Sequence, residues 1–265
     1  MIKIPSTLTI AGSDSGGGAG IQADLKTFAF HRVHGSSVIT CVTAQNTVTV
    51  TDVLPIPPLI VKSQLEAVFN DLEIKSLKTG MLLNQEIMTT VAHFLTQISL
   101  ENIVIDPVMV SRTGSLLIDN QAITTLTKLL IPKALIVTPN IYEAQLLSDV
   151  EIFDIKDMEK SAQKIYELGA KNILIKGGAR EGKNKGIDLF YDGKKSQILQ
   201  IKTINTKNTH GTGCTLAAAI TANLALGKPL FTAVAQGKEY VTNALEYGLD
   251  IGAGAGPVAH FYSLL

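Results

Sequence analysis

Two glycine-rich segments contain the residues of this chain that are best suited to chemistry. The first glycine turn is residues 12–20 (GSDSGGGAG), and the second is residues 208–214 (NTHGTGC). Each lies where an extended stretch gives way to a helical pattern, so its amides are expected to be unpaired and close to the positive end of a helix. The sequence therefore predicts two anion-binding turns, and the second also carries a thiol, Cys214.

The second turn gives the stronger prediction. Gly211 and Gly213, with Thr212 between them, free the backbone to point several N–H groups at one spot, which suits a transferring phosphoryl group. The start of the following helix is expected to lower the pKa of Cys214 from about 8.5, so that it can act as a general base towards a substrate hydroxyl. A small buried cysteine that packs the helix start is the alternative.

The first turn has three interpretations. Residues 18–23 match the G-x-G-x-x-A fingerprint of dinucleotide-binding folds, but the next predicted strand ends in Gln45 and Asn46, where an acidic residue would hold a ribose. The other interpretations are a tight strand–helix connection and a loop whose glycines let the backbone approach a flat ligand. Neither turn contains the Gly-Lys-Ser/Thr of a P-loop.

Further polar side chains stand at or beyond the ends of other predicted strands. Asn140 and Glu143 have the spacing of a helix capping box. Alternatively, Glu143 holds the water shell of a Mg²⁺ ion, to which Asp106 contributes unless it caps its own loop. Lys176 ends an apolar strand before two glycines, so we predict that it contacts nucleotide phosphates rather than solvent.

Three further residues stand earlier in the chain. Gln45 presents an amide donor and acceptor side by side, which fits the N–C–NH₂ edge of an amino-heterocycle; a simple turn residue is the alternative. Asp24 is close enough to the first turn to face the same pocket, or it is an ordinary surface charge. Cys41, between apolar neighbours, is predicted to lie in the core.

The elements that would position these residues follow an alternating pattern. Strands are predicted at residues 7–11, 36–43, 76–79, 102–106, 134–137 and 172–176, and helices at 21–31, 59–71, 86–97, 121–130, 158–168, 212–226 and 231–247. This rhythm, with strands apolar on both faces, predicts an α/β fold with a mostly parallel sheet covered by helices on two sides. Residues 186–191 and 196–201 flank Asp192-Gly193 and predict an antiparallel edge hairpin.

Composition limits the possible functions. The 265 residues include 23 Lys and Arg and 23 Asp and Glu, so the net charge is zero and a nucleic-acid partner is not expected. Two cysteines do not make a disulfide framework, and no apolar run approaches the ~20 residues that span a bilayer. We expect one domain over residues 1–265, in a cytoplasmic protein without a membrane partner.

Seven segments, in order, resemble the hydroxymethylpyrimidine/phosphomethylpyrimidine kinases, the thiamine-pathway branch of the ribokinase-like superfamily. They are AGSDSGGGAGIQADLKTF (11–28), SVITCVTAQNT (37–47), TGML (79–82), DPVMV (106–110), TPNIYE (138–143), KGG (176–178) and NTHGTGCT (208–215). Each motif alone is weakly specific, but the ordered set covers nearly the whole chain.

The resemblance implies a three-layer α/β/α sandwich without a separate lid domain, and a homodimer. It also implies two successive ATP-dependent, Mg²⁺-assisted phosphorylations. The first acts on 4-amino-5-hydroxymethyl-2-methylpyrimidine, and the second converts its monophosphate into the diphosphate. One departure is Thr79, where the family often has isoleucine; it puts the shape of the pocket slightly in question.

The resemblance also implies roles for individual residues. It places the pyrimidine-binding glutamine on Gln45, the catalytic cysteine on Cys214 and the phosphate-contacting lysine on Lys176. The magnesium motif falls on Asn140 and Glu143, with Asp106 on the metal side, and the pocket wall falls on Gly12, Asp24, Met81 and Val108. Because related sugar kinases carry aspartate where this chain has Cys214, positioning rather than deprotonation is an alternative role for the thiol.

Two rival functions remain at this point. A pyridoxal or pyridoxine kinase would share the fold and the reaction, although residues 43–47 favour a pyrimidine. A non-catalytic pyrimidine-binding protein would not need Lys176, Glu143 and the complete second turn.

Overall fold

A nine-stranded sheet forms the middle layer of the protein. The computed structural model describes residues 3–109, 118–178 and 186–265, so Val110, the last residue of the DPVMV segment, lies outside them. The strand order is β3-β2-β1-β4-β5-β6-β7-β8-β9. The strands are β1 (Ser6–Asp14), β2 (His34–Gln45), β3 (Val50–Pro55), β4 (Ile74–Thr79), β5 (Ile103–Ile105), β6 (Ile136–Val137), β7 (Ile173–Ile175), β8 (Asp188–Tyr191) and β9 (Ser196–Leu199).

The six central strands (β2, β1, β4, β5, β6 and β7 in order across the sheet) run parallel, and antiparallel strands close both edges. The predicted hairpin at one edge is confirmed as β8 and β9. At the other edge, β3 was not predicted, because its side chains are mostly exposed and give no alternating pattern. Pro55 ends this strand, as proline is tolerated on an edge.

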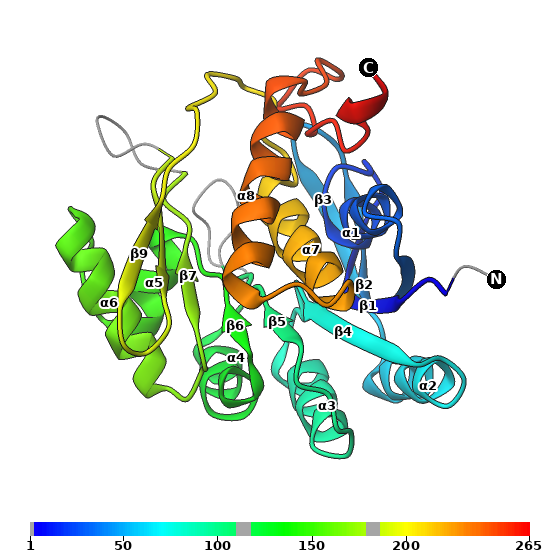
Figure 1. Cartoon of the computed structure of the whole chain (residues 1–265). Helices are drawn as coiled ribbons and strands as arrows, with labels where there is room; N and C mark the ends of the chain where they lie inside the picture. Colours follow the sequence, from blue (N-terminus) through cyan, green and yellow to red (C-terminus); the bar gives the residue numbers. More distant parts are fainter. Residues whose placement is uncertain (1–2, 110–117, 179–185) are drawn as a thin grey trace.

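Helices cover both faces of the sheet (Figure 1). They are α1 (Gly20–Phe30), α2 (Pro58–Phe69), α3 (Gln85–Leu95), α4 (Asn120–Thr125), α5 (Ile141–Ser148), α6 (Ile155–Glu167), α7 (Thr212–Ala225) and α8 (Leu230–Glu246). Helices α2 to α6 pack on one face and α1, α7 and α8 on the other. The predicted α/β/α layering of a mostly parallel sheet is confirmed.

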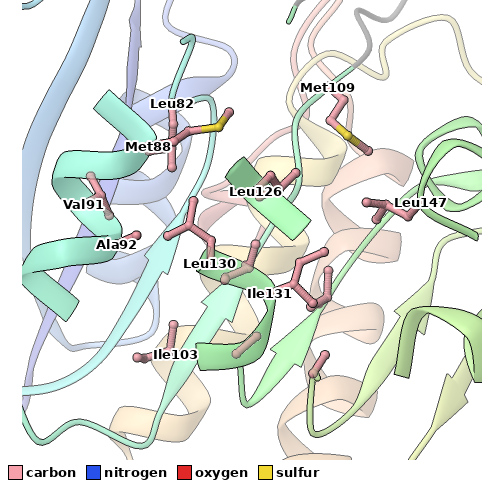
Figure 2. Close-up of a cluster of buried hydrophobic side chains, with 14 of the residues drawn as sticks. Leu82, Met88, Val91, Ala92, Ile103, Met109, Leu126, Leu130, Ile131 and Leu147 are labelled. Carbon is pink, nitrogen blue, oxygen red and sulfur yellow. The ribbon is translucent and has the colours of Figure 1, made fainter. Parts of the chain in front are cut away.

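Side chains along the short central strands point alternately to the two covered faces of the sheet, which explains why these strands are apolar at every position. Ile103 and Ile105 of β5 point into the core under α2 to α6, whereas Val104 points to the core under α7 and α8. Because neighbouring side chains point to opposite faces, a strand covered on both sides buries every residue. Figure 2 shows the first of these cores, with labelled side chains Leu82, Met88, Val91, Ala92, Ile103, Met109, Leu126, Leu130, Ile131 and Leu147.

Helix α7 follows the second glycine turn and packs closely because its side chains are small. Ala217, Ala218, Ala219 and Ala222 are fully buried between the sheet and its neighbours. Alanine also has the highest helix propensity, so the segment is both a strong helix former and a close-packing surface. The turn is therefore held rigidly against the sheet.

Two differences from the predicted helices are local. The helix predicted at 121–130 is an α-helix only to Thr125 and continues as a π-helical turn over Leu126–Leu130. Helix α5 is absent from the predicted helices, although it begins with the capping box that Asn140 and Glu143 predicted. No helix of the described ranges has the length and apolarity needed to cross a membrane.

Candidate active site

The carboxyl ends of the six parallel strands lie at one edge of the sheet, and the predicted site residues gather there. Asp14 ends β1 and Gln45 ends β2, while Asp106 and Lys176 directly follow β5 and β7. Ligands bind at this edge in open α/β sheets. The fold therefore brings together Asp14 and Lys176, which are 162 positions apart in the chain.

The two glycine turns touch at this edge. Gly211 has a φ of +82°, and a Cβ there would lie 1.8 Å from the carbonyl oxygen of Gly18. A Cβ on Gly18 would in turn lie 2.3 Å from Cδ2 of His210. Both positions therefore require glycine, one for its backbone conformation and both for close approach.

The first turn is closed by its own carboxylate. The amides of Gly16, Gly18 and Ala19 donate to Asp14 at 2.8, 3.0 and 2.8 Å, and Nε2 of His210 lies 2.8 Å from Asp14 Oδ2. Burial raises the pKa of Asp14, but these hydrogen bonds outweigh it and hold the pKa below its ordinary value. The prediction that this turn is an anion cradle is wrong; of its interpretations, the tight strand–helix connection fits.

The second turn is open. Within the described parts of the chain, no acceptor is in hydrogen-bond geometry with the amides of Gly211, Gly213 or Cys214. The Thr212 hydroxyl is already used, since it donates to the carbonyl of Thr209 at 2.7 Å. Unpaired amides at the start of a fourteen-residue helix are suited to an anion, so this turn fits the predicted anion site.

A lysine stands beside the open turn. Nζ of Lys176 donates to Asp106 Oδ1 at 2.7 Å, and a Cβ on Gly213 would lie 3.4 Å from this Nζ and 3.9 Å from Asp106 Oδ2. Burial lowers the pKa of Lys176, but the carboxylates of Asp106 and Glu143 outweigh it and raise the pKa. A fixed positive charge therefore faces the place where unpaired amides converge.

Two roles were predicted for Glu143, a capping box and a share in a magnesium site. The structure shows the capping box, and the position of Glu143 fits the magnesium site. Its Oε2 accepts the amide of Asn140 at 2.8 Å, and Asn140 accepts the amide of Glu143 at 2.9 Å, so the capping box is confirmed. Burial raises the pKa of Glu143 to about 7, with Lys176 opposing the rise and Asp106 adding to it. The carboxyl thus lies within the same charge cluster as Lys176 and Asp106.

The residues present fit a magnesium ion held mostly by other ligands. No three of the described His, Cys, Asp and Glu side chains come together as a metal-binding group. Mg²⁺ is commonly bound by one or two carboxylates plus waters and substrate phosphates. Glu143 and Asp106, beside the open turn, would supply that carboxylate share.

Gly177 has a packing reason to be glycine. A Cβ there would lie 1.9 Å from the carbonyl oxygen of Ile187. Its amide donates to Asp188 Oδ1 at 2.9 Å, and Asp188 Oδ2 binds Nζ of Lys238 at 2.7 Å. The sequence interpretation linked this glycine to phosphate binding by Lys176; the structure shows that it holds β7 against β8.

Gln45 lies beside His210 of the second turn. It is half-buried; Thr43 Oγ1 donates to its Oε1 at 3.4 Å, and its Nε2 lies 3.4 Å from Nε2 of His210. Met81 and Val108, at the next strand ends, are also half-buried. These placements fit a pocket wall in which Gln45 provides the polar group.

Gly12 is a buried part of this wall. A Cβ on Gly12 would lie 2.6 Å from Sγ of Cys41 and 2.9 Å from Cε of Met81. Any side chain here would therefore displace Cys41 or Met81. Cys41 is fully buried, as predicted.

Cys214 differs from its prediction. It is half-buried, and burial raises the pKa of its thiol to about 11; Lys78 opposes the rise, Asp24 and Asp106 add to it, and a hydrogen bond from the Gly20 amide lowers it. Desolvation and two carboxylates raise the pKa, which is opposite to the direction expected from the helix start, so the expected low pKa is wrong. Cys214 is a thiol at neutral pH.

Asp24 does not face a pocket, and neither alternative made for it from sequence is correct. The side chains of Asp24 and Lys78 are both 0% exposed, and Nζ of Lys78 donates to both carboxylate oxygens at 3.0 and 2.8 Å. Thr9 also donates to Asp24, at 2.6 Å. Burial lowers the pKa of Lys78, but the charges of Asp24, Cys214 and Asp106 together outweigh it and raise the pKa, while burial also raises the pKa of Asp24.

Sequence reasoning missed three residues of this region. Asp14 was quoted only as part of a turn, His210 only as the residue before a glycine, and Lys78 not at all. Lys78 is the penultimate residue of β4, whose sequence IKSLKT is mostly polar, so nothing in the sequence marks it as a buried lysine. The pairing of His210 with Asp14 joins distant segments and gives no sequence signal either.

Comparison with known proteins agrees with this geometry. The family model described as phosphomethylpyrimidine kinase matches residues 14–259. The chain is 56% identical to a hydroxymethylpyrimidine/phosphomethylpyrimidine kinase of Synechococcus elongatus, over 99% of this chain and 100% of the relative. It is 47% identical to the enzyme of the same name from Haemophilus influenzae, over the full length of both.

Solved structures are similar in fold. An ADP complex of Bacillus subtilis pyridoxal kinase superposes with a TM-score of 0.91 at 36% identity, covering 99% of both chains. The phosphomethylpyrimidine kinase of Clostridium difficile gives 0.81 at 42% identity, covering 91% of this chain and 99% of that one. With a family model that spans most of its length and relatives of this identity, the chain belongs to the phosphomethylpyrimidine kinase family.

Proposed function

We propose that the protein transfers the γ-phosphoryl group of ATP to the hydroxymethyl group of 4-amino-5-hydroxymethyl-2-methylpyrimidine, and then phosphorylates that monophosphate to the diphosphate for thiamine biosynthesis. One observation carries the proposal: the second turn has unpaired amides with the Lys176 ammonium beside Gly213, and its His210 lies next to the amide of Gln45. The names of the most similar curated relatives point to the same substrates.

The phosphate side follows from charge. The amides of Gly211, Gly213 and Cys214 would surround the transferring group, and Lys176 would neutralise charge as it develops on the equatorial oxygens. Mg²⁺, when bound near Glu143 and Asp106, supplies further charge neutralisation on the nucleotide. Solved pyridoxal kinases in complex with ADP or AMP-PCP support the use of ATP.

The acceptor side follows from hydrogen bonding. Gln45 would bind the amino-pyrimidine edge and turn the hydroxymethyl oxygen towards the second turn, against the wall of Gly12, Met81 and Val108. Cys214, with its pKa at about 11, would position the hydroxyl and share its proton rather than remove it as a thiolate. Phosphoryl transfer depends mainly on such positioning and on charge stabilisation.

An exposed apolar surface supports the proposed homodimer. Val48, Val50 and Leu54 on and beside β3, with Leu59 and Ile60 at the start of α2, are 48 to 71% exposed. Large exposed apolar residues grouped at a sheet edge are typical of an interface. Light scattering on Leu54→Asp, compared with the native protein, tests this, and we expect the variant to be monomeric. We further propose a cytoplasmic location, where its two free thiols stay reduced.

The decisive experiment supplies Mg·ATP and three acceptors: the hydroxymethylpyrimidine, its monophosphate and pyridoxal. We expect mono- and diphosphate products, with pyridoxal at least about 100-fold poorer in kcat/KM. Solved pyridoxal kinases that are 36–37% identical make pyridoxal the second candidate substrate. Phosphorylation of pyridoxal alone would overturn the pyrimidine assignment, and no turnover would leave a binding protein.

Replacing the glutamine tests its role directly. Gln45→Leu removes both hydrogen bonds to the heterocycle, so KM for the pyrimidine should rise by about 10²-fold while hydrolysis of ATP in the absence of acceptor survives. Gln97→Leu, on the exposed end of the α3 region, is the matched control and should behave like the native enzyme. An unchanged KM for Gln45→Leu would remove Gln45 from the substrate site.

A further inference from the structure

The segment that follows α8 contains three glycines that neither half of the site explains. Residues 251–257 (IGAGAGP), called the C-terminal strap below, return from α8 over the end of β2 and β3 (Figure 1). A Cβ on Gly252, Gly254 or Gly256 would lie 2.3, 2.0 or 1.9 Å from a neighbouring atom. The strap therefore needs glycine because it touches other backbone and side chains directly.

On one side the strap binds the loop next to Gln45. The amide of Gly254 donates to Thr47 Oγ1 at 3.2 Å, and the amide of Ala255 donates to the Thr47 carbonyl at 3.1 Å. The two clashes of a Cβ on Gly252 or Gly254 are also with Thr47. Thr47 lies two residues after Gln45, so the strap fixes the loop that begins at the proposed pyrimidine-binding side chain.

On the other side the strap binds the start of the second glycine turn. Asn208 Oδ1 accepts the amide of Gly256 at 3.2 Å, and its Nδ2 donates to the carbonyl of Gly248 at 3.3 Å. The amide of His210 donates to the Gly256 carbonyl at 3.1 Å, and the amide of Val258 donates to the His210 carbonyl at 3.2 Å. The turn that would hold the phosphoryl group is therefore tied to the same short segment.

We infer that Thr47 and Asn208 are positioning residues, which act through the C-terminal strap to set the distance between the acceptor and the transferring phosphoryl group. The strap links the two loops through Thr47 and Asn208. The contact between Gln45 and His210, at 3.4 Å, links the same loops within the site. The inference rests on the proposed function, because it assigns the acceptor to one loop and the phosphoryl group to the other. Each loop can still bind its own ligand when the strap is loosened, but the two ligands are then held less well in line.

Thr47→Val tests the first anchor. It removes the hydroxyl that accepts the Gly254 amide and keeps the shape of the side chain. We expect kcat for transfer to fall about tenfold, while the separate dissociation constants of nucleotide and pyrimidine, measured by calorimetry, stay within about twofold. Thr49→Val is the matched control, since the exposed Thr49 hydroxyl only donates to the neighbouring Val50 carbonyl, at 3.4 Å.

The ratio of phosphoryl transfer to hydrolysis of ATP by water is a further measurement. A loss of stability alone would not change this ratio. This ratio should fall in Thr47→Val and stay native in Thr49→Val. A pyrimidine dissociation constant that rises with kcat unchanged would show that Thr47 only shapes the pocket and would overturn the inference. A response equal to that of Thr49→Val would overturn it as well.

A double-mutant cycle tests whether the two anchors act through one element. Asn208→Ala should show the same loss of kcat with intact binding, and Asn102→Ala, whose amide binds Lys75 far from the site, is its control. Because both anchors hold the strap, the loss in the double variant should be clearly smaller than the product of the single losses. Multiplicative losses would mean independent roles and would contradict the inference.

The outcome stays distinguishable from failure of the proposed function. If the native enzyme phosphorylates pyridoxal and not the pyrimidines, the substrate assignment fails, but the same ratios and the same cycle are measured with pyridoxal as acceptor. The strap inference is contradicted only by the patterns given above, with whichever acceptor is turned over.

Discussion

The two glycine turns look alike in sequence and differ in what fills them. In the first, three amides donate to Asp14, whose carboxylate occupies the place of an anion. In the second, the amides at the start of α7 have no such partner within the described residues, and the Lys176 ammonium stands beside them. A glycine turn before a helix is therefore a place for an anion, and the protein supplies that anion itself in one case.

The first turn therefore has a structural role, and the second turn is the one that is open to a ligand. Asp14 ties the first turn together and also holds His210 of the second turn, so the closed turn supports the open one. An anion from outside can enter only where the protein has left the amides free. The predictions below separate these two roles, beginning with the largest expected effect.

Asp14→Ala should cost about 3–5 kcal/mol of unfolding free energy, because it leaves three amides, of which that of Gly18 is buried, and the His210 side chain without their shared partner. Urea unfolding followed by circular dichroism measures the loss. Asp52→Ala is the control, since the exposed Asp52 carboxylate accepts only the neighbouring Val53 amide. A loss of less than 1 kcal/mol would show that the first turn does not need its carboxylate.

The same group predicts a pH dependence. The pKa of Asp14 is lower in the folded protein, so its ionised form contributes stability that is present above the ordinary value of 3.8. That stability is lost as the pH falls through the folded pKa. The native protein should therefore lose more stability in acid than Asp14→Asn does, and equal losses would contradict the assigned hydrogen bonds.

Lys176→Met should lower kcat by about 10²-fold or more, equivalent to about 2.7 kcal/mol, because it removes the fixed positive charge beside the open turn. Steady-state kinetics with saturating Mg·ATP measures this. Lys202→Met is a suitable control, since that lysine pairs with Glu246 and its side chain is 64% exposed. If KM for ATP changed and kcat did not, Lys176 would act in binding ATP and not in the transfer step.

Gly213→Ala separates activity from stability within one variant. A Cβ there meets Lys176 Nζ at 3.4 Å, an ordinary contact, so the fold should tolerate it and gain up to about 1 kcal/mol from reduced chain entropy. The methyl group would stand where the phosphoryl group is expected, so kcat should fall about tenfold. Native activity would show that the transferring group lies elsewhere.

Cys214→Ser should have the smallest effect, a loss of kcat of about fivefold or less, because a thiol with its pKa at about 11 does not supply a thiolate. Alkylation by iodoacetamide checks the protonation state. Below this pKa the thiolate fraction rises about tenfold per pH unit, so the rate should rise steadily from pH 7 to pH 10. A rate that is already constant at pH 7 would restore the general-base role.

Local and periodic features of the fold could be read from the sequence. The capping box of Asn140 and Glu143 involves residues three positions apart, and the central strands bury both faces, so both gave clear signals. The exposed edge strand β3 gave none. Features made by distant partners were also missed, such as the bond between Thr47 and Gly254, which are 207 residues apart.

The candidate site divides in the same way. Gln45, Lys176, Asp106, Glu143 and Gly213 lie where the motifs indicated, since each follows a strand end or starts a helix. The predictions for the position of Asp24 and for the pKa of Cys214 were wrong. Both depend on burial and on Lys78, which lies 54 residues from Asp24 in the sequence. Sequence motifs indicate which residues meet at the sheet edge, but they do not show which of them remain open to a ligand.

The contact between Gly211 and the Gly18 carbonyl also limits how these kinases can be recombined. A Cβ at position 211 would lie 1.8 Å from that oxygen. Neither turn can therefore change its backbone course towards the other unless the other turn moves as well. A chimaera that joins the N-terminal half of one family member to the C-terminal half of another therefore brings together two surfaces that must fit as a pair. Crossover points that keep both turns from the same parent should yield folded enzymes more often than those that separate them.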